Sequence, residues 1–469
     1  MASRGHRTER DALGEVEVPA DRYWGAQTQR ALEHFAIGGQ RWPRPFLRAL
    51  GLCKLAAARV NLELGLLPRD KAGWIAQAAQ EMADGTLDDH FPLVVWQSGS
   101  GTQTNMNANE VIANRATEIA GGKLGGKHLV HPNDDVNRCQ SSNDVIPSAI
   151  HVAAACETSE RLLPALRALR GALEEKSRAW SDIVKLGRTH LQDATPITLG
   201  QEFSGYAAQL AGAERALERA LPEVLRLAQG GTAVGTGVNA HPEFGERFAA
   251  EIARLTGLPF ASAPNKFAAL AGDDALVALH GAMRQLACAL SKQAEDVRWL
   301  ASGPRGGLGE LIIPENEPGS SIMPGKVNPT QCEAMRLVCM QVLANDVAVS
   351  LGGVAGNFEL SMARPLLAKT VLESTALLAD ACLSYRRHCI DGLEPDRERI
   401  RAHLERSLML VTALAPRIGY DAAAEIAQRA HREGKTLREV ALASGRVTAA
   451  EFDAIVDAKR MTRPGLGDG

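Results

Sequence analysis

The feature that most constrains this chain is one dense loop, Gly319–Pro329, which reads GSSIMPGKVNP. Helical patterns flank the loop on both sides. Its two glycines allow backbone amides to approach a ligand closely, because glycine has no Cβ. Asn328 followed by Pro329 is typical of a helix start, with Asn at the N-cap and Pro at the first helical position. The loop is therefore expected to aim the positive end of a helix dipole at itself.

The side chains of this loop indicate an anion site. Lys326 adds a full positive charge, and Ser320 and Ser321 add hydroxyls. Such a loop suits a carboxylate and the extra negative charge that a carboxylate gains when an α-proton leaves. The alternative is a flexible surface turn, but loops this rich in special residues usually carry function. A nucleotide P-loop does not fit, because the glycine spacing is one residue too long and Val327 follows the lysine where Ser or Thr is required.

Length and composition limit the class of protein. A chain of 469 residues is expected to form two or three domains. It is 45% hydrophobic and only 4% aromatic, a profile typical of soluble helical proteins. A net charge of −3 without a long basic stripe argues against nucleic acid or a membrane as a partner. No apolar run approaches the roughly 18 to 20 residues of a membrane span, and the N-terminus lacks a secretory apolar segment, so we expect a cytoplasmic protein.

The eight cysteines include no CxxC pair. Cys332 and Cys339 are seven residues apart, as are Cys382 and Cys389, so each pair is expected to share one buried helix face. No HExxH motif is present either. The sequence therefore predicts neither a zinc nor an iron–sulfur site.

Two polar stretches precede predicted helices. The stretch SGSGTQTNMNANEV turns into an amphipathic helix near Asn109, which places Ser100 and Thr102 just ahead of a helix N-terminus. Ser141–Asn143 open a long helix in the same way. Hydroxyls and amides at such positions either bind an anion or only cap the helix. The repetition of this arrangement along the chain favours anion binding.

Helical periodicity predicts an all-α fold. Helices are expected at 47–64 and 72–82, and long ones at 143–178, 197–228, 274–302 and 329–353. Pro164 is expected to kink the first long helix. The predicted domains are an N-terminal, mostly helical domain (1–140), a central long-helix bundle (141–363) and a small helical C-terminal domain (364–469) whose short helices are capped by threonines. Long helices with few aromatics favour a bundle that packs against copies of itself.

His190 is the candidate for proton transfer. It follows Thr189 in a polar connection, KLGRTHLQDATPITLGQE, between the first two long helices. A lone histidine is more often structural, but its position in a polar loop favours acid–base chemistry. Further upstream, His131–Asp134 (HPND) is predicted to form a proline-containing turn.

Four stretches together resemble a known family. GSSIMPGKVNP is similar to the signature loop of the fumarase/aspartase superfamily. GSGTQTNMNANEV, HPNDDVNRCQSSNDVIP and GRTHLQDATPITLGQEFSGYAAQL resemble class II, iron-independent fumarases in particular. The resemblance runs from Val18 to the C-terminal helices. It implies a three-domain fold whose central bundle forms a tetramer core, and reversible hydration of fumarate to L-malate without a cofactor.

The resemblance also implies residue roles. Ser320 would remove the C3 proton of malate, Lys326 and Asn328 would stabilise the aci-carboxylate, and His190, oriented by Glu333, would handle water on the opposite face. The implied substrate-binding residues are Ser100, Gly101, Thr102, Ser141, Ser142, Asn143, Thr189, Ser321, Lys326, Val327 and Asn328. A secondary dicarboxylate site would comprise His131, Pro132, Asn133 and Asp134.

Two alternatives stand beside this interpretation. Aspartate ammonia-lyase, or another superfamily lyase that releases fumarate, is the nearest; aspartases differ at the GTQTNMN and SSNDV stretches and have alanine at the position of Gly325. The other is a non-catalytic protein on the same fold. A decayed copy is expected to have lost one of His190, Ser320, Lys326 or Glu333, and all four are present.

Chain geometry predicts a site shared between subunits. A helix over 143–178 is roughly 50 Å long at 1.5 Å per residue. Ser141–Asn143 lie at its start, whereas His190 lies a short connector beyond its end. Both groups can act on one small dicarboxylate only if they come from different chains, or if the helix is far shorter than its pattern indicates. The resemblance agrees, because it implies a homotetramer in which three chains contribute to each site.

Overall fold

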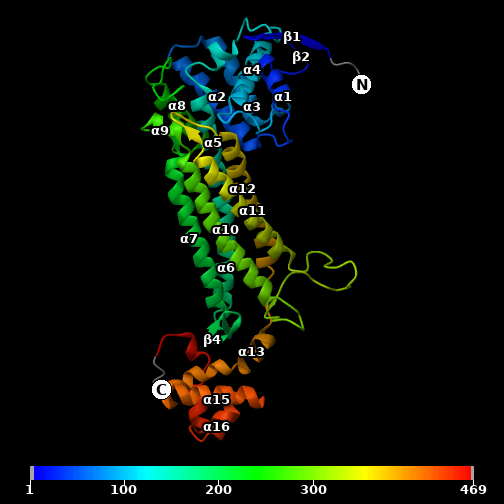
Figure 1. Ribbon diagram of the computed structural model, residues 1–469, viewed down its shortest axis with the longest axis vertical. Helices are drawn as coiled ribbons and strands as arrows, with labels where there is room; N and C mark the ends of the chain where they lie inside the picture. The colour runs from blue at the N-terminus through cyan, green and yellow to red at the C-terminus, as the bar shows by residue number, and fades with distance from the viewer. Residues whose placement is uncertain (1–4, 466–469) are drawn as a thin grey trace. The chain divides into compact units, whose positions relative to one another are not determined.

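The computed structural model describes residues 5–465, which form a mainly helical protein (Figure 1). The described residues divide into two compact units. The first comprises the residues up to Pro164 together with Ala213–Ala287 and Val338–Ala379, and the second comprises Ala165–Gly212, Cys288–Leu337 and the residues from Asp380 onward. The three-part division by sequence position remains a prediction.

Seven helices lie wholly within the first unit: α1 (Ala26–His34), α2 (Arg44–Glu63), α3 (Arg69–Asp84), α4 (Thr102–Ile119), α5 (Ser142–Glu157), α8 (Phe244–Thr256) and α9 (Lys266–Ala271). Five helices contain a unit boundary: α6 (Leu163–Ala179), α7 (Leu199–Val224), α10 (Asp274–Leu300), α11 (Thr330–Gly353) and α12 (Arg364–Tyr385). The second unit holds α13 (Arg397–Glu405), α14 (Ala415–Ile418), α15 (Tyr420–Glu433), α16 (Leu437–Ala443) and α17 (Ala449–Ile455).

The strands of the described residues form five short two-stranded ladders. Four are antiparallel: β1 (His6–Asp11) with β2 (Gly14–Pro19), β3 (Val184–Thr189) with β4 (Gln192–Thr198), β7 (Leu311–Ile312) with β10 (Glu394–Pro395), and β8 (Gly356–Asn357) with β9 (Leu360–Ser361). The fifth pairs β5 (Arg226–Leu227) with β6 (Ala261–Ser262) in parallel. None of these ladders was predicted from helical periodicity.

Helix α2 lies at the centre of the first unit. Its sequence is apolar on nearly every side, and it packs against α3, α5 and α8. Pro43 lies at its N-cap and the backbone of Gly51 touches α3, where a Cβ would overlap the Ala83 backbone. Burial of apolar surface at roughly 25 cal/mol per Å² is the main stabilising term of such a helix.

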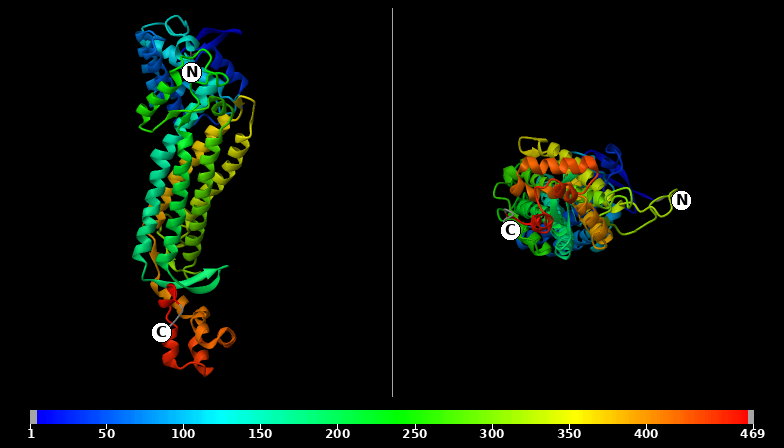
Figure 2. Two further views of the ribbon diagram at one scale, coloured as in Figure 1. Left: turned by 90° about the vertical axis from the view of Figure 1, so that its left-hand side faces the viewer. Right: turned by 90° about the horizontal axis from the view of Figure 1, so that it is seen from below.

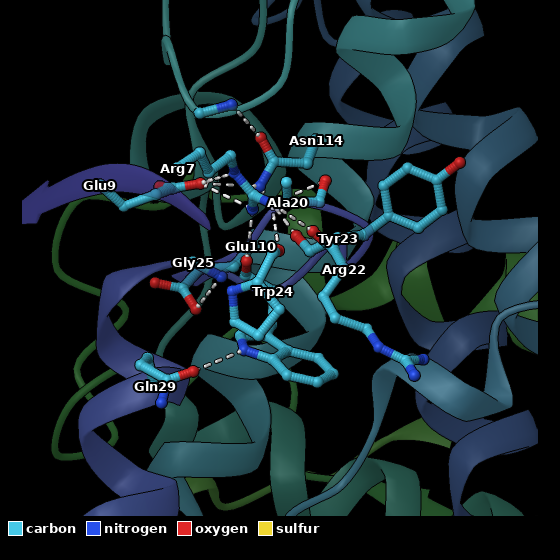
Figure 3. Close-up of polar contacts among 12 residues, drawn as sticks. Arg7, Glu9, Ala20, Arg22, Tyr23, Trp24, Gly25, Gln29, Glu110 and Asn114 are labelled. Atoms are coloured by element: carbon cyan, nitrogen blue, oxygen red, sulfur yellow. Dashed lines mark hydrogen bonds and ion pairs between the residues drawn. The ribbon is translucent and has the colours of Figure 1, made fainter. Parts of the chain in front are cut away.

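Helix α4 is anchored by a buried carboxylate (Figure 3). Glu110 accepts a hydrogen bond from the backbone N–H of Gly25 at 2.9 Å, as Figure 3 shows. It also accepts from the backbone N–H groups of Gln27 and Thr28 and from the Thr28 hydroxyl, at 2.7–3.1 Å. These are the free N–H groups at the start of α1, which a carboxylate satisfies well. Burial nevertheless raises the pKa of Glu110. The contact fixes α4, and therefore its first turn, to the N-terminal segment.

The long helical run after Ser141 is interrupted near the predicted kink. A π-helical turn at Thr158–Leu162 separates α5 from α6, directly ahead of Pro164. Proline cannot donate the backbone hydrogen bond that a regular helix requires, so one extra residue is accommodated before it. The helix is therefore interrupted next to Pro164, and the kink itself remains a prediction.

The C-terminal segment of the second unit has its own apolar core, which includes Leu414, Ile426, Val440 and Phe452. Thr436 and Thr448 form capping boxes with Glu439 and Glu451 at the starts of α16 and α17. The predicted threonine caps are therefore confirmed. The expected burial of Cys332, Cys339, Cys382 and Cys389 is also confirmed.

Helix α11 differs from the expectation that no stretch is apolar enough to span a membrane. Its mean hydropathy reaches 1.3 over an eighteen-residue window, only a third of which is buried. By length and composition alone this helix passes the test for a membrane span, as the core helices of soluble proteins also do. It carries two apolar faces, and one of them lies on the surface of the chain.

Candidate active site

The loop Gly319–Pro329 closes on itself. The Asn328 amide donates a hydrogen bond to the Gly319 carbonyl. A Cβ at residue 319 would overlap the Lys326 carbonyl oxygen, so the first glycine is required by contact within the loop. Gly325 has φ +77°, a conformation that glycine adopts without strain. The two glycines shape the loop itself rather than only opening it to a ligand.

Ser320 and Ser321 have different surroundings. The Ser320 Oγ accepts hydrogen bonds from the backbone N–H groups of Ile322 at 3.2 Å and Met323 at 2.9 Å. Two donors on one hydroxyl oxygen stabilise negative charge there, as an activated serine requires. The neighbouring Ser321 is exposed and makes no comparable contact among the described residues. These contacts favour Ser320 over Ser321 as a serine that can carry negative charge.

The predicted helix start is wrong by one residue. Helix α11 begins at Thr330, and the Pro329 carbonyl accepts the first helical hydrogen bond, from the Glu333 N–H at 3.1 Å. Pro329 therefore occupies the N-cap, and Asn328 lies outside the helix. Its side-chain amide serves the loop closure instead of the helix terminus, because the Gly319 carbonyl lies within its reach.

The other loop residues lie on the surface of the single chain. Lys326 is exposed and Val327 is half-buried. Ile322 and Met323 expose 82% and 49% of their surfaces, although both are apolar. Exposed apolar side chains grouped in one loop mark a contact surface for a partner or a ligand.

Thr189 and His190 lie at the tip of the β3–β4 hairpin (Figure 2), not in an irregular loop. Thr189 pairs with Gln192, which leaves His190 and Leu191 as a two-residue turn with φ of +58° and +60°. Positive φ at both positions is the geometry of a type I′ hairpin, normally formed by Asn-Gly. Non-glycine residues rarely adopt positive φ, and backbone strain of this kind is concentrated at functional sites.

A buried ion cluster holds this hairpin. Glu310, which is fully buried, contacts Lys185 at 3.1 Å, Arg188 at 2.6 Å and the His403 Nδ1 at 3.1 Å. Arg188 and Lys185 keep the pKa of Glu310 below its usual value despite burial. Because Lys185 and Arg188 belong to β3, the cluster fixes the strand that presents His190.

His190 lines a pocket of about 490 Å³ together with Arg188, Glu202, Lys292 and Asp296. Glu333 does not line this pocket. Its carboxylate is half-exposed and lies 4.0 Å from the Arg298 guanidinium. Among the described residues of one chain, no hydrogen bond joins His190 to Glu333, so their pairing remains a prediction.

The stretch around Thr102 forms the first turn of a helix. Helix α4 begins at Thr102 and not near Asn109, because Gly101 adopts φ +72° and ends the preceding loop at the N-cap. A Cβ at residue 101 would lie 3.1 Å from the Ile146 side chain. Ser100 is nearly buried, and its hydroxyl lies 3.3 Å from that of Ser98.

The second polar stretch meets the first. The Ser142 hydroxyl lies 2.7 Å from that of Thr102. Ser141 caps α5 through a capping box with Asp144, so the capping alternative holds for this residue. Asn143 donates one amide hydrogen to the Ala233 carbonyl at 2.8 Å and retains a second. The structure therefore joins the two stretches that the sequence placed at separate helix starts.

Two buried basic side chains that the sequence analysis did not single out lie next to these stretches. The Arg364 guanidinium donates to the Asn143 carbonyl at 2.8 Å, and its backbone N–H donates to the Gly99 carbonyl at 3.0 Å. Lys54 contacts the residues just before Ser141. The available signal was a lysine or arginine within an otherwise apolar helical run, GLCKLAAARV or MARPLL. Such residues are almost never fully buried without a partner.

The predicted secondary-site residues form a compact turn. Pro132–Val136 form one π-helical turn, and the His131 Nδ1 accepts the backbone N–H groups of Asn133 and Asp134 at 3.1–3.2 Å. The His131 ring also lies 3.4 Å from the Asp134 carboxylate. These contacts bring the four residues together in one turn, as predicted. The His131 Nδ1 accepts hydrogen bonds within the turn, so this nitrogen is already occupied.

The predicted site residues fall into two groups. Ser100–Thr102 and Ser141–Asn143 belong to the first compact unit. Thr189, His190, the loop Gly319–Pro329 and Glu333 belong to the second. The first unit therefore holds hydroxyl and amide donors, and the second holds the serine, lysine and histidine that are predicted to be catalytic.

Comparisons with known proteins agree with this helical fold. A protein family described as lyase matches residues 14–344, and a family described as fumarase C C-terminus matches residues 410–463. These matches define the chain as a lyase of the fumarase type.

Curated relatives narrow the class. A class II fumarate hydratase of Ralstonia nicotianae is 61% identical over 97% of this chain and 99% of the relative. That of Myxococcus xanthus is 60% identical over 98% and 99%. The class II fumarase structure from Schistosoma mansoni is 42% identical, with a TM-score of 0.96 over 98% of this chain and all of the other. This chain belongs to the class II fumarate hydratase family.

Proposed function

We propose that this chain catalyses the reversible hydration of fumarate to L-malate, a step of the tricarboxylic acid cycle. The observation that carries the proposal is the Ser320 hydroxyl, whose oxygen receives two backbone N–H groups in a loop that also bears Lys326. That arrangement suits a base that must carry negative charge. The names of the full-length relatives support the same reaction.

In the malate-to-fumarate direction, the Ser320 alkoxide takes the C3 proton. The electron pair of the C–H bond moves into the adjacent carboxylate, which becomes an aci-carboxylate dianion. Lys326, the loop amides and the remaining Asn328 N–H stabilise the added charge, in the manner of an oxyanion hole. The C2–O bond then breaks, and His190 protonates the departing hydroxide to give water. Glu333 orients His190 in this scheme, as a carboxylate orients a catalytic imidazole.

The hydroxyl and amide groups of the first unit bind the substrate carboxylates. The Thr102–Ser142 hydroxyl pair offers one donor and the Asn143 amide another, at or near a helix N-terminus, where the backbone adds partial positive charge. Neutral donors suit a dicarboxylate that must also leave as product.

The proposed assembly is a cytoplasmic homotetramer with sites shared between chains. Its support is the apolar surface of α11, on which Met340, Val347 and Leu351 expose 52%, 61% and 64% of their surfaces. An apolar face of this kind requires a partner, and a second copy of the same helix supplies a complementary one. A tetramer brings the loop of one chain to the hydroxyl groups of another.

The reaction is tested by absorbance. Purified protein is incubated separately with L-malate and with L-aspartate, and fumarate formation is followed. We expect fumarate from malate alone; release of fumarate from aspartate would instead identify an ammonia-lyase. The rate with malate is expected to survive dialysis against EDTA, because no group of three or more His, Cys, Asp or Glu side chains within residues 5–465 is arranged to hold a metal. Loss of activity that returns with iron or manganese would contradict the assignment to the iron-independent class.

A further inference from the structure

Lys54 is a fully buried lysine within α2, and its amine contacts two amide oxygens. It donates to the Asn137 Oδ1 at 3.1 Å and to the Gln140 Oε1 at 3.0 Å. Among the described residues, no carboxylate lies within salt-bridge distance of this amine. Charged or neutral, a lysine amine has at least two N–H donors, enough for both oxygens. The two contacts therefore fix which atoms of Asn137 and Gln140 face it.

Asn137 is held in one orientation as a result. Its Oδ1 accepts a second hydrogen bond, from the Asn105 amide at 3.3 Å, and its own amide donates to the Gln140 carbonyl at 3.1 Å. An amide oxygen has two acceptor positions, and both are used here. A flipped Asn137 would present its NH₂ group to the donors of Lys54 and Asn105.

Asn105 links Asn137 to the candidate site, and the orientation of Asn137 determines which side of the Asn105 amide faces it. The same amide nitrogen that faces Asn137 donates to the Ser142 hydroxyl at 2.9 Å. The Asn105 Oδ1 is buried and has no hydrogen-bond partner among the described residues. If Asn105 flipped, its amide N–H groups would point to where its oxygen now has no hydrogen-bond partner, and they would gain no acceptor there. Its oxygen would then lie against the Asn137 oxygen. Ser142 must therefore accept from Asn105.

The hydrogens at the end of the chain can be counted. The Ser142 and Thr102 hydroxyls carry two hydrogens between them, and their 2.7 Å contact uses one. Because Asn105 supplies its own hydrogen to Ser142, the second hydroxyl hydrogen is free to point outward. Thr102 lines a pocket of about 280 Å³ within the first unit.

We propose that Lys54 is a positioning residue that fixes the direction of this hydrogen-bond chain, so that the Thr102–Ser142 pair donates to a substrate carboxylate. The chain runs from Lys54 through Asn137 and Asn105 to the hydroxyl pair. Without Lys54, only the Gln140 carbonyl still favours the present orientation of Asn137, so both amides flip more readily. In the flipped state the Asn105 oxygen takes a hydrogen from Ser142. The pair would face the carboxylate with lone pairs, which repel it. This inference rests on the proposed function, because it assigns these hydroxyls to substrate carboxylate binding.

The test compares Lys54→Met with Asn61→Leu in the full-length enzyme. Asn61 lies on the same helix and donates to the Arg138 carbonyl at 3.0 Å. Its loss removes a buried hydrogen bond to the segment that contains Asn137 and Gln140, but it leaves the hydrogen bonds from Lys54 to Ser142 unchanged. We expect Lys54→Met to raise the KM for both malate and fumarate by about 10- to 100-fold, with less than about a threefold change in kcat, since uniform binding is lost. Asn61→Leu is expected to leave both constants near wild type. Equal KM changes in the two variants would overturn the proposal.

A second pair keeps the test decisive if Lys54→Met does not fold. Asn137→Leu removes the acceptor at the centre of the chain, whereas Asn137→Asp keeps an oxygen facing both Lys54 and Asn105. KM is expected to rise more in the leucine variant than in the aspartate variant, and the reverse order would overturn the proposal. A wild-type enzyme that converts malate but shows no KM response in any variant refutes the positioning role alone. A wild-type protein inactive on malate refutes the proposed function as well.

Discussion

The Thr102 hydroxyl lies 2.7 Å from the Ser142 hydroxyl, although the two residues are 40 positions apart and begin different helices. Two hydroxyls in contact at the ends of α4 and α5 form one donor unit rather than two independent caps. We therefore expect Thr102→Val and Ser142→Ala to be strongly non-additive. Each single change is expected to raise KM about 10-fold or more, because a donor to a charged group is lost.

The measurement is a double-mutant cycle on KM and on the dissociation constant of succinate. Residues that act through one hydrogen bond show coupling of about 0.5–3 kcal/mol. Additive losses within experimental error would contradict a shared role for the pair. Thr104→Val on the same helix is a control, because its hydroxyl donates to the Gln97 side chain and not to Ser142.

The two serines of the loop are expected to differ sharply. Ser320→Ala removes the oxygen that receives two backbone N–H groups, so kcat is expected to fall by about 10²–10⁴-fold while succinate binding persists. Ser321→Ala is the matched control, with a smaller loss. Equal losses in steady-state kinetics at both positions would remove the support for Ser320 as the base.

Much of the fold and part of the site follow from local sequence. Apolar periodicity located α2 and α10 to within a few residues. The Thr436 and Thr448 caps could also be predicted, because a capping box involves residues only three positions apart. The hairpin that presents His190 could not be predicted from local sequence, because His-Leu is an unusual pair for a type I′ turn. The strand before the turn is held by tertiary ion pairs to Glu310. Pairing across long sequence separations leaves no periodic signal.

The same limit applies to the residues behind the site. The apolar runs around Lys54 and Arg364 indicate that these side chains are buried, but the sequence does not identify Asn137 and Asn143 as their partners. Asn328 was misplaced because its local pattern favoured a cap, whereas the Gly319 carbonyl, nine residues away, competes for its amide. Contacts that depend on how a loop closes are decided by geometry that the local pattern does not contain.

Glu333→Gln tests the orientation of His190. The change removes a charge but keeps size and one hydrogen-bonding oxygen, and the half-exposed carboxylate tolerates it without unfolding. If Glu333 orients the imidazole, kcat is expected to fall and the pH–rate profile to shift, because a neutral amide no longer stabilises the imidazolium. Initial rates across pH 5.5–9 provide the test. A profile that overlies that of the wild type would make Glu333 a surface carboxylate paired with Arg298.

Lys54 is expected to make stability depend on pH. Burial lowers its pKa from 10.5 to about 7, so between these values the unfolded chain holds a proton that the folded chain has lost. Stability therefore rises with pH above about 7, by up to about 1.4 kcal/mol per unit, and the penalty is fully present below pH 7. Lys54→Met lacks this dependence.

Urea unfolding of both proteins at pH 7 to 9, at one protein concentration, measures the difference. Burial raises the pKa of Asp144 to about 6 in the wild type, and the Lys54 charge lowers that pKa. Loss of this charge raises the pKa of Asp144 in Lys54→Met, which lowers the stability of the variant as pH rises and adds to the expected difference in the same direction. The stability of the wild type relative to Lys54→Met is expected to increase with pH. A constant difference would show that Lys54 keeps its proton in the folded enzyme.

The last prediction concerns sharing of the site between chains. Asn143 belongs to the first compact unit and His190 to the second, and the chain remains helical for most of the distance between them, from Ser142 through Ala179. If each site of a homotetramer draws these groups from different chains, then Asn143→Ala and His190→Asn damage different contributors. Each variant alone is expected to be inactive, because every site in a uniform tetramer carries the defect. Mixed tetramers are expected to regain part of the activity, because in some sites every group comes from an unmutated chain.

Co-expression with two different affinity tags isolates tetramers that contain both variants, and uniform tetramers of each variant provide the baseline. Verified mixed tetramers that stay at this baseline would mean that each site is built within a single chain.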